Sequence, residues 1–199
     1  GTCSTFCSVA GYGSDVTPNM VGSNLPSPNV ASASSNYPGS YWPYWAFDGT
    51  PGGESCWLTY VSWLPAWLKF DFGSGNTKTV TKYRLVTQYT GYEAVVAQRC
   101  PHTWTFQGSH DNSSWTTLDS RSNITGWVSG TWREFTFSNS TAYRYYLINV
   151  TAINGDPNYL MINEMEMMQA TPSGTGTAGS SGTGGVGGSN SGGSYGGGG

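Results

Sequence analysis

Few residues of this chain have the types and spacing of a catalytic centre. The two histidines, His102 and His110, stand at the start of an expected strand and in a polar turn. No phosphate-binding loop or His-Glu-X-X-His motif occurs. The acidic residues are scattered and form no acid–base couple. The sequence therefore predicts a protein that is not an enzyme.

A metal ion is a better match to the residues, at segment 48–55. This segment reads Asp-Gly-Thr-Pro-Gly-Gly-Glu-Ser and offers acids, hydroxyls and glycines that can turn backbone carbonyls inward. Calcium takes six to eight such oxygen ligands in a tight loop. The alternative is that Asp48 only caps its own turn.

Composition excludes two other classes of partner. The 199-residue chain has 10% charged residues, and its eight Lys and Arg are scattered, which argues against a nucleic-acid surface. No apolar run approaches the ~20 residues that span a bilayer. Aromatic residues make up 15% of the chain and are concentrated in segment 31–60. The length allows one sizeable domain with extensions.

Cysteines and sequons indicate a secreted product. Because the chain starts at Gly1, we also expect a processed protein. Of the possible disulfide pairings we favour Cys3 with Cys7 and Cys56 with Cys100, and the alternative is free buried thiols. Potential glycosylation sites are Asn112, Asn123, Asn139 and Asn149.

Alternating apolar residues predict strands with one buried face. The clearest is the hairpin at 99–118, in which Trp104 and Phe106 share a face and a polar turn follows. We expect further strands at 68–72, 80–87, 133–137, 143–151 and 160–168, and a loop at 88–98. Short strands separated by turns, without a convincing helix, predict an all-β antiparallel sandwich.

The chain divides into three parts by composition. Residues 1–30 lack sustained periodicity and are interpreted as an irregular arm, and residues 31–169 as the sandwich. Residues 170–199 are rich in Gly, Ser and Thr, which predicts a flexible linker or a tail held by neighbouring subunits.

Four ordered motifs give the sandwich a family resemblance. They are Tyr-Trp-Ala-Phe-Asp-Gly at 44–49, Trp-Leu-Lys-Phe-Asp-Phe-Gly at 67–73, Trp-Thr-Phe-Gln-Gly-Ser at 104–109, and segment 143–168 with Ile-Asn-Glu-Met-Glu-Met. Residues 31–169 thereby resemble the discoidin (coagulation factor V/VIII type C) domains and the related galactose-binding-like carbohydrate-binding modules. The resemblance implies a jelly-roll β-sandwich that recognises glycans.

The resemblance also implies site residues. A structural calcium would be held by the Asp48 side chain, the carbonyls of Trp45 and Gly53, Thr50 and Glu164, although relatives often carry Asn or Asp where Thr50-Pro51 stands. A sugar would lie on the loops at one end of the sandwich, near Trp57, Tyr89, Tyr92, Arg99, Asn154 and Tyr159. The alternatives are an ion pair of Arg99 with Glu93 or Asp156, and core or rim packing of Trp57 and Tyr159.

Three functions follow from these interpretations. The first is an extracellular, non-catalytic carbohydrate-binding module. The second is a structural subunit of a glycosylated extracellular filament or surface assembly, in which residues 1–30 and 171–199 contact other copies. The third is an accessory module of a glycan-degrading enzyme.

Overall fold

The computed structural model describes residues 12–88 and 93–170, without the side chains of Tyr12, Ser14 and Glu93. Its strands are β1 (Tyr12–Asp15), β2 (Val30–Ala33), β3 (Trp57–Tyr60), β4 (Ala66–Asp71), β5 (Val80–Val86), β6 (Pro101–Ser109), β7 (Thr116–Arg121), β8 (Arg133–Thr136), β9 (Tyr145–Ile153), β10 (Tyr159–Ile162) and β11 (Glu164–Ala170). Three short helices, η1 (Pro43–Phe47), η2 (Val61–Trp63) and α1 (Glu93–Gln98), connect them.

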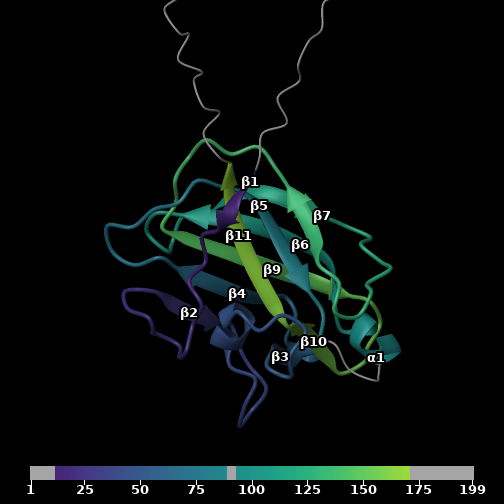
Figure 1. The fold of residues 1–199 in the computed structure, drawn as a ribbon. Coiled ribbons are helices and arrows are strands. Elements are labelled where there is room, and N and C mark those ends of the chain that lie inside the picture. The colour runs from purple at the N-terminus through teal and green to yellow at the C-terminus, as the bar shows by residue number, and fades with distance from the viewer. Residues whose placement is uncertain (1–11, 89–92, 171–199) are drawn as a thin grey trace, which may run out of the picture.

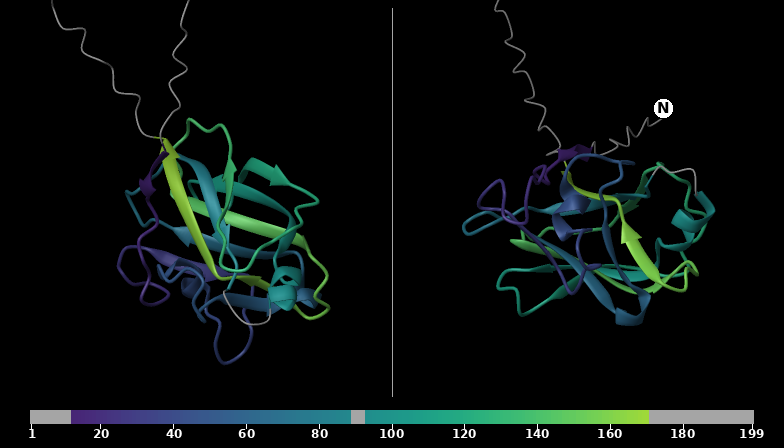
Figure 2. Two further views of the ribbon diagram at one scale, coloured as in Figure 1. Left: turned by 45° about the vertical axis from the view of Figure 1, so that its right-hand side comes forward. Right: turned by 90° about the horizontal axis from the view of Figure 1, so that it is seen from below.

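Two antiparallel sheets face each other across the core (Figure 1). One has the order β1-β11-β5-β8, the other has the order β2-β4-β9-β6-β7, and the pair β10-β3 lies at one end. Figure 2 shows the same layers from two other sides, with α1 at the edge of the sandwich. The predicted β-sandwich is confirmed.

The alternation predicted from the sequence decides which side chains fill the core. Phe70, Ile148 and Phe106 come from neighbouring strands of the five-stranded sheet, and each is 0% exposed. Because successive strand residues point to opposite faces, Lys69 and Leu147 lie on the outer face of this sheet.

One polar network crosses the core. Trp104 Nε1 donates to the Tyr83 hydroxyl at 2.7 Å, and this hydroxyl donates to Asp119 Oδ2 at 2.8 Å. Arg121 Nε reaches the same carboxylate oxygen at 2.7 Å. The buried indole N–H and phenol are thereby satisfied, as buried polar groups must be.

Two local predictions were wrong. The pattern predicts one strand over 160–168, whereas the chain forms β10 and β11, which belong to different sheets and are separated by the buried Asn163. The expected loop at 88–98 contains α1. This helix is stabilised because it buries Val96 in a small cluster with Cys56, Leu58 and Met161. A solvated loop would not bury this side chain.

The described part of the expected arm packs on the sandwich. β1 pairs antiparallel with β11, and Met20 is 1% exposed, with its N–H donating to Phe47 O at 2.7 Å. Residues 1–11 and 171–199, the rest of the arm and almost all of the tail, lie outside the described residues. Among the described helices, none is long and apolar enough to cross a membrane.

Candidate functional site

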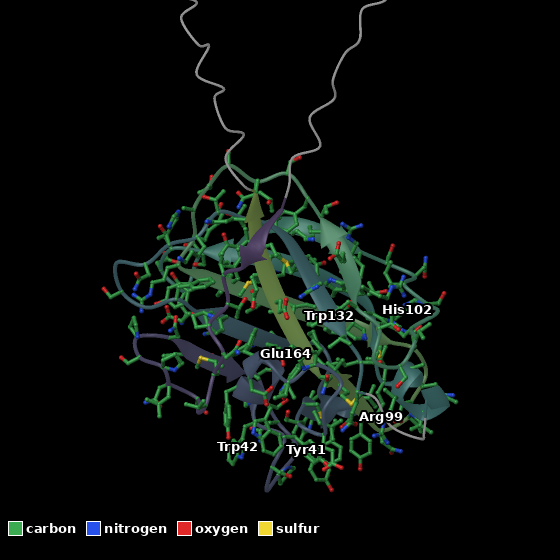
Figure 3. The ribbon with its side chains drawn as sticks, viewed as in Figure 1. Tyr41, Trp42, Arg99, His102, Trp132 and Glu164 are labelled. Atoms are coloured by element: carbon green, nitrogen blue, oxygen red, sulfur yellow. The ribbon has the colours of Figure 1, made fainter. Side chains whose placement is uncertain are left out.

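Aromatic rings gather at the end of the sandwich formed by β3, β10 and the loop before η1 (Figure 3). We define the aromatic end cluster as Tyr37, Tyr41, Tyr60, Trp63 and Tyr159. The pairing of β3 with β10 places Tyr60 opposite Tyr159. The Tyr37 ring centroid lies 5.2 Å from that of Tyr60 and 5.6 Å from that of Tyr159. The rings therefore form one continuous surface.

The surface is open to solvent at Trp63, which is 45% exposed and whose ring centroid lies 4.9 Å from that of Tyr60. Trp42, which follows Tyr41 in the sequence, is 43% exposed. Tyr41 has a φ of 64°, in the left-handed region that a bulky side chain rarely adopts. Such backbone conformations are held by their surroundings and are concentrated at functional sites. Tyr41 and Trp42 were not among the predicted ligand contacts, although the aromatic segment 31–60 was a signal for them.

Arg99 borders the aromatic end cluster (Figure 3). Its Nε lies 2.8 Å from Asp156 Oδ2, and its guanidinium carbon lies 4.9 Å from the centroid of the Tyr159 ring. The other Asp156 oxygen accepts the N–H groups of Asn158 and Tyr159 at 2.8 and 2.9 Å. Desolvation acts to raise the pKa of Asp156, but these hydrogen bonds and the Arg99 charge outweigh it and lower the pKa. A charged pair thus fixes the guanidinium beside the rings.

A second arrangement of oxygen atoms lies where β11 begins. Glu164 is 2% exposed, and its Oε1 accepts the Gly49 N–H at 3.1 Å. Its Oε2 is buried with no hydrogen-bond partner among the described residues. Burial raises the pKa of Glu164 to about 9; the Gly49 hydrogen bond opposes this shift and the nearby Asp48 carboxylate adds to it.

The loop that faces Glu164 is held in shape by Asn163. Gly52 N–H donates to Asn163 Oδ1, and Asn163 Nδ2 donates to Gly53 O and Ser55 O. Asn163 is 0% exposed. Asn163 was not among the predicted site residues, although a single amide inside an apolar run was a signal.

These residues fit calcium. A buried carboxyl oxygen without a partner, beside a second carboxylate, is costly to ionise, and a bound cation would compensate the charges of both carboxylates. Asp48 Oδ1 now accepts the Thr50 N–H at 2.9 Å and the Thr50 hydroxyl. Within residues 12–88 and 93–170 no three His, Cys, Asp or Glu side chains group as metal ligands. An ion at this site would therefore need hydroxyl and carbonyl oxygens in addition to Asp48 and Glu164, as hard cations accept.

A comparison with known protein families identifies the family of this chain. The F5/8 type C domain pattern matches residues 30–165. The chain belongs to the F5/8 type C domain family. The resemblance deduced from the four sequence motifs is thereby confirmed. A search of curated proteins finds no match.

Solved structures share the fold of this F5/8 type C domain. A chitosan-binding module of a chitosanase/glucanase from Paenibacillus sp. IK-5 is 22% identical, with a TM-score of 0.57, over 78% of this chain and 98% of that module. The family 32 carbohydrate-binding module of Streptococcus pneumoniae EndoD is 13% identical, with a TM-score of 0.58, over 77% and 98%. The family 32 module of Clostridium perfringens NanJ, solved with galactose, is 18% identical, with a TM-score of 0.53, over 71% and 93%.

The structure of this F5/8 type C domain places the predicted ligand residues in different surroundings. Arg99 and Tyr159 lie together at the aromatic end cluster, with the ion pair of Arg99 formed to Asp156. Trp57 was wrong as a ligand contact, because it is 0% exposed on the inner face of β3 and its Nε1 donates to Ser35 O at 2.8 Å. Asn154 Nδ2 donates to Cys100 O and Pro101 O at 3.1 and 3.2 Å and so anchors the start of β6. The remaining predicted residues, Tyr89 and Tyr92, lie outside the described residues.

The predicted bridge between Cys56 and Cys100 is absent from the structure. Both are buried free thiols. Cys100 Sγ donates to Val96 O at 3.3 Å within the main core, whereas Cys56 belongs to the small cluster under α1. Burial raises the pKa of Cys56 to about 12, so its thiolate is disfavoured. Cys3 and Cys7 lie outside the described residues.

The sequons differ in their surroundings. Asn112 and Asn123 are exposed, and Asn149 is half-buried on the outer face of β9. Asn139 Nδ2 donates to Val80 O and Thr141 O at 3.0 and 2.9 Å, and a glycan on this nitrogen would disturb those bonds. Glycosylation at all of these positions stays a prediction.

Proposed function

We propose that this chain is a non-catalytic carbohydrate-binding module that works outside the cell and binds a glycan at the aromatic end cluster. The observation that carries the proposal is the solvent-facing ring surface bordered by the fixed Arg99–Asp156 pair. Solved modules of the same fold were crystallised with galactose or named for chitosan, which supports a sugar ligand.

The chemistry of the aromatic end cluster suits a pyranose ring. The C–H face of a sugar packs on an aromatic ring, and its hydroxyls need donors and acceptors of fixed direction. Arg99 supplies planar N–H donors, and the tyrosine hydroxyls supply both functions. The ion pair with Asp156 and the contact with Tyr159 hold the guanidinium before the ligand arrives, which lowers the entropy cost of binding.

The first experiment is a glycan array probed with the full chain, followed by calorimetry with galactose, N-acetylgalactosamine and chitotriose. We expect Tyr159→Ala and Arg99→Ala each to weaken binding of the best ligand at least about tenfold, because each removes a ring contact or fixed donors. An array without any bound glycan would contradict the proposal.

The chain contains a matched control for this site. Arg144 lies 2.7 Å from Asp71 and has its guanidinium carbon 4.6 Å from the Tyr145 ring, so it forms the same kind of trio away from the end cluster. Tyr145→Ala and Arg144→Ala should leave glycan affinity within about twofold of the parent, since the trio lies off the proposed site. Equal losses in both trios would point to a general loss of stability instead.

We propose further that calcium binds between Asp48 and Glu164, with Thr50 and the carbonyls of Trp45 and Gly53 as additional ligands. Bound calcium would neutralise the two carboxylates and stabilise segment 48–55. Asn163 would set the direction of the Gly53 carbonyl through its amide. The site is then structural, and the glycan site lies elsewhere, at the aromatic end cluster.

A further inference from the structure

The outer face of the five-stranded sheet contains a groove of about 410 Å³, away from the aromatic end cluster and the Asp48–Glu164 site. Its floor is set by strand register. Leu147 on β9 lies opposite Lys69 of β4 on one side and opposite Gln107 of β6 on the other. The next outward-facing row places Trp67 opposite Asn149. We call this depression the sheet-face groove.

Two indoles stand on the two sides of β9. Trp67 comes from β4, and Trp115 comes from the hairpin between β6 and β7, and both are half-buried. Leu147 between them is 7% exposed. Partly exposed indoles on both sides of a narrow floor provide apolar faces for flat, ring-shaped ligands.

The polar groups of the groove are almost all neutral. Gln107, Asn112 and Asn149 contribute amides. Lys69 is the only charged side chain among the described residues that line it. Its Nζ donates to Asn112 Oδ1 at 2.7 Å and lies 4.8 Å from the centroid of the Trp67 ring. Amides both donate and accept hydrogen bonds, so they match the hydroxyl groups of a sugar.

We propose that the sheet-face groove is a second carbohydrate site, which takes a linear, neutral oligosaccharide along the sheet. The indoles pack on the sugar rings, and the amides and Lys69 bind the hydroxyls. A polyanion would need more than one cation in the groove. A protein partner typically uses about 20 residues or more on each side, whereas seven residues line this groove.

This site is independent of the aromatic end cluster. The groove residues lie on β4, β6, β9 and the β6–β7 hairpin, whereas the end cluster lies on β3, η2, β10 and the loop before η1. A long glycan could engage one site and a short terminal sugar the other. Failure of one proposal therefore does not entail failure of the other.

The test is calorimetry of the full chain with cellohexaose, xylohexaose and chitohexaose as probes. The protein is produced in a bacterial host, because Asn112 and Asn149 in the groove are themselves sequons, and an N-glycan on either amide would exclude the ligand proposed for the groove. We expect millimolar or tighter binding of at least one hexaose. Trp115→Ala and Gln107→Ala should each weaken it, and Trp115→Ala by at least about tenfold.

Matched variants separate the outcomes. Trp132 is half-buried, and its ring centroid lies 4.2 Å from the guanidinium carbon of Arg84, a residue of the other sheet. Trp132→Ala should leave hexaose affinity unchanged. Arg99→Ala should also leave the affinity for cellohexaose and xylohexaose unchanged, since neither sugar is a candidate ligand of the aromatic end cluster. If Arg99→Ala abolishes hexaose binding and Trp115→Ala does not, the groove proposal is overturned and the end-cluster proposal stands.

Two further results would overturn the groove proposal. One is no hexaose binding by a folded parent protein. The other is tighter binding of hexagalacturonate than of any neutral hexaose, which would refute a neutral ligand. Thermal unfolding of each variant by circular dichroism verifies that it is folded, and Gln107→Ala keeps the test decisive if Trp115→Ala is unstable.

Discussion

Replacing Glu164 with Gln should stabilise the protein when calcium is removed. The Glu164 carboxyl is 2% exposed, and burial raises its pKa from 4.5 to about 9. The folded state therefore keeps a proton at pH 7 that the unfolded state has released. Because the native state binds more protons in this window, stability falls as the pH rises from 4.5 towards 9.

The size of the effect follows from that window. Each pH unit between the unfolded pKa and the working pH costs about 1.4 kcal/mol, so Glu164 lowers the free energy of unfolding at pH 7 by about 3 kcal/mol. A Gln side chain is neutral at every pH and can still accept the Gly49 N–H. In excess chelator at pH 7, Glu164→Gln should be more stable than the parent by up to about 3 kcal/mol. Below pH 4.5 the two proteins should converge.

Calcium should reverse this order. A ligand that binds only the folded state at 1,000 times its dissociation constant adds about 4.1 kcal/mol to the parent, which exceeds the deficit of about 3 kcal/mol. The Gln variant has lost one of two carboxylates and should gain little. The assay is urea unfolding followed by circular dichroism, at pH 4.5 and pH 7, with chelator or with calcium.

Two results would refute the reasoning. A Gln variant less stable than the parent in chelator at pH 7 would show that the carboxylate is charged and satisfied without metal. Equal calcium stabilisation of both proteins would place the ion elsewhere. Glu134→Gln is the matched control, because Glu134 lies away from segment 48–55 and is 49% exposed; any cost of losing its 3.1 Å pair with Lys82 should be the same with chelator and with calcium.

Two other predictions concern the core. Tyr83→Phe leaves the buried Trp104 N–H without its acceptor, so we expect a loss of about 1–3 kcal/mol in urea unfolding. A change below about 0.5 kcal/mol would mean that another acceptor replaces the hydroxyl. Gly108→Ala would bring a Cβ to 2.5 Å from the Tyr143 ring. It should cost about 1–3 kcal/mol by overcrowding. Gly75→Ala separates this cost from backbone strain, because nothing lies within 4 Å of its added Cβ but its φ is 78°.

Most strands could be predicted from the sequence because their alternation is local. The spacing of two positions between Leu68 and Phe70, and between Trp104 and Phe106, already indicates which side chains are buried. Neighbouring residues of a strand point to opposite faces, so residues two apart share a face. The motifs that define the family also lie along these strands. The predicted loop at 88–98 and the predicted single strand at 160–168 were wrong, because α1 and the break at Asn163 depend on contacts with segments distant in the sequence.

The site could be predicted only in part. The sequence predicted Asp48, Glu164, Arg99 and Tyr159 as site residues, each within a recognisable motif or loop. It did not show that Trp57 points into the core, because an isolated tryptophan at the start of a short strand has no alternation to give its direction. Nor did it show Tyr41 at the surface in a left-handed backbone conformation, which neighbouring rings hold in place.

The sequence by itself determined the sandwich class, the family and the chemical types available for binding. Only the tertiary structure decided which of these residues meet. Leu147 lies opposite both Lys69 and Gln107, and Asn163 reaches the loop of Gly53, through pairings between residues at least 40 positions apart (147 − 107 = 40). Local patterns carry no information about such register, because it is fixed by the packing of the whole core.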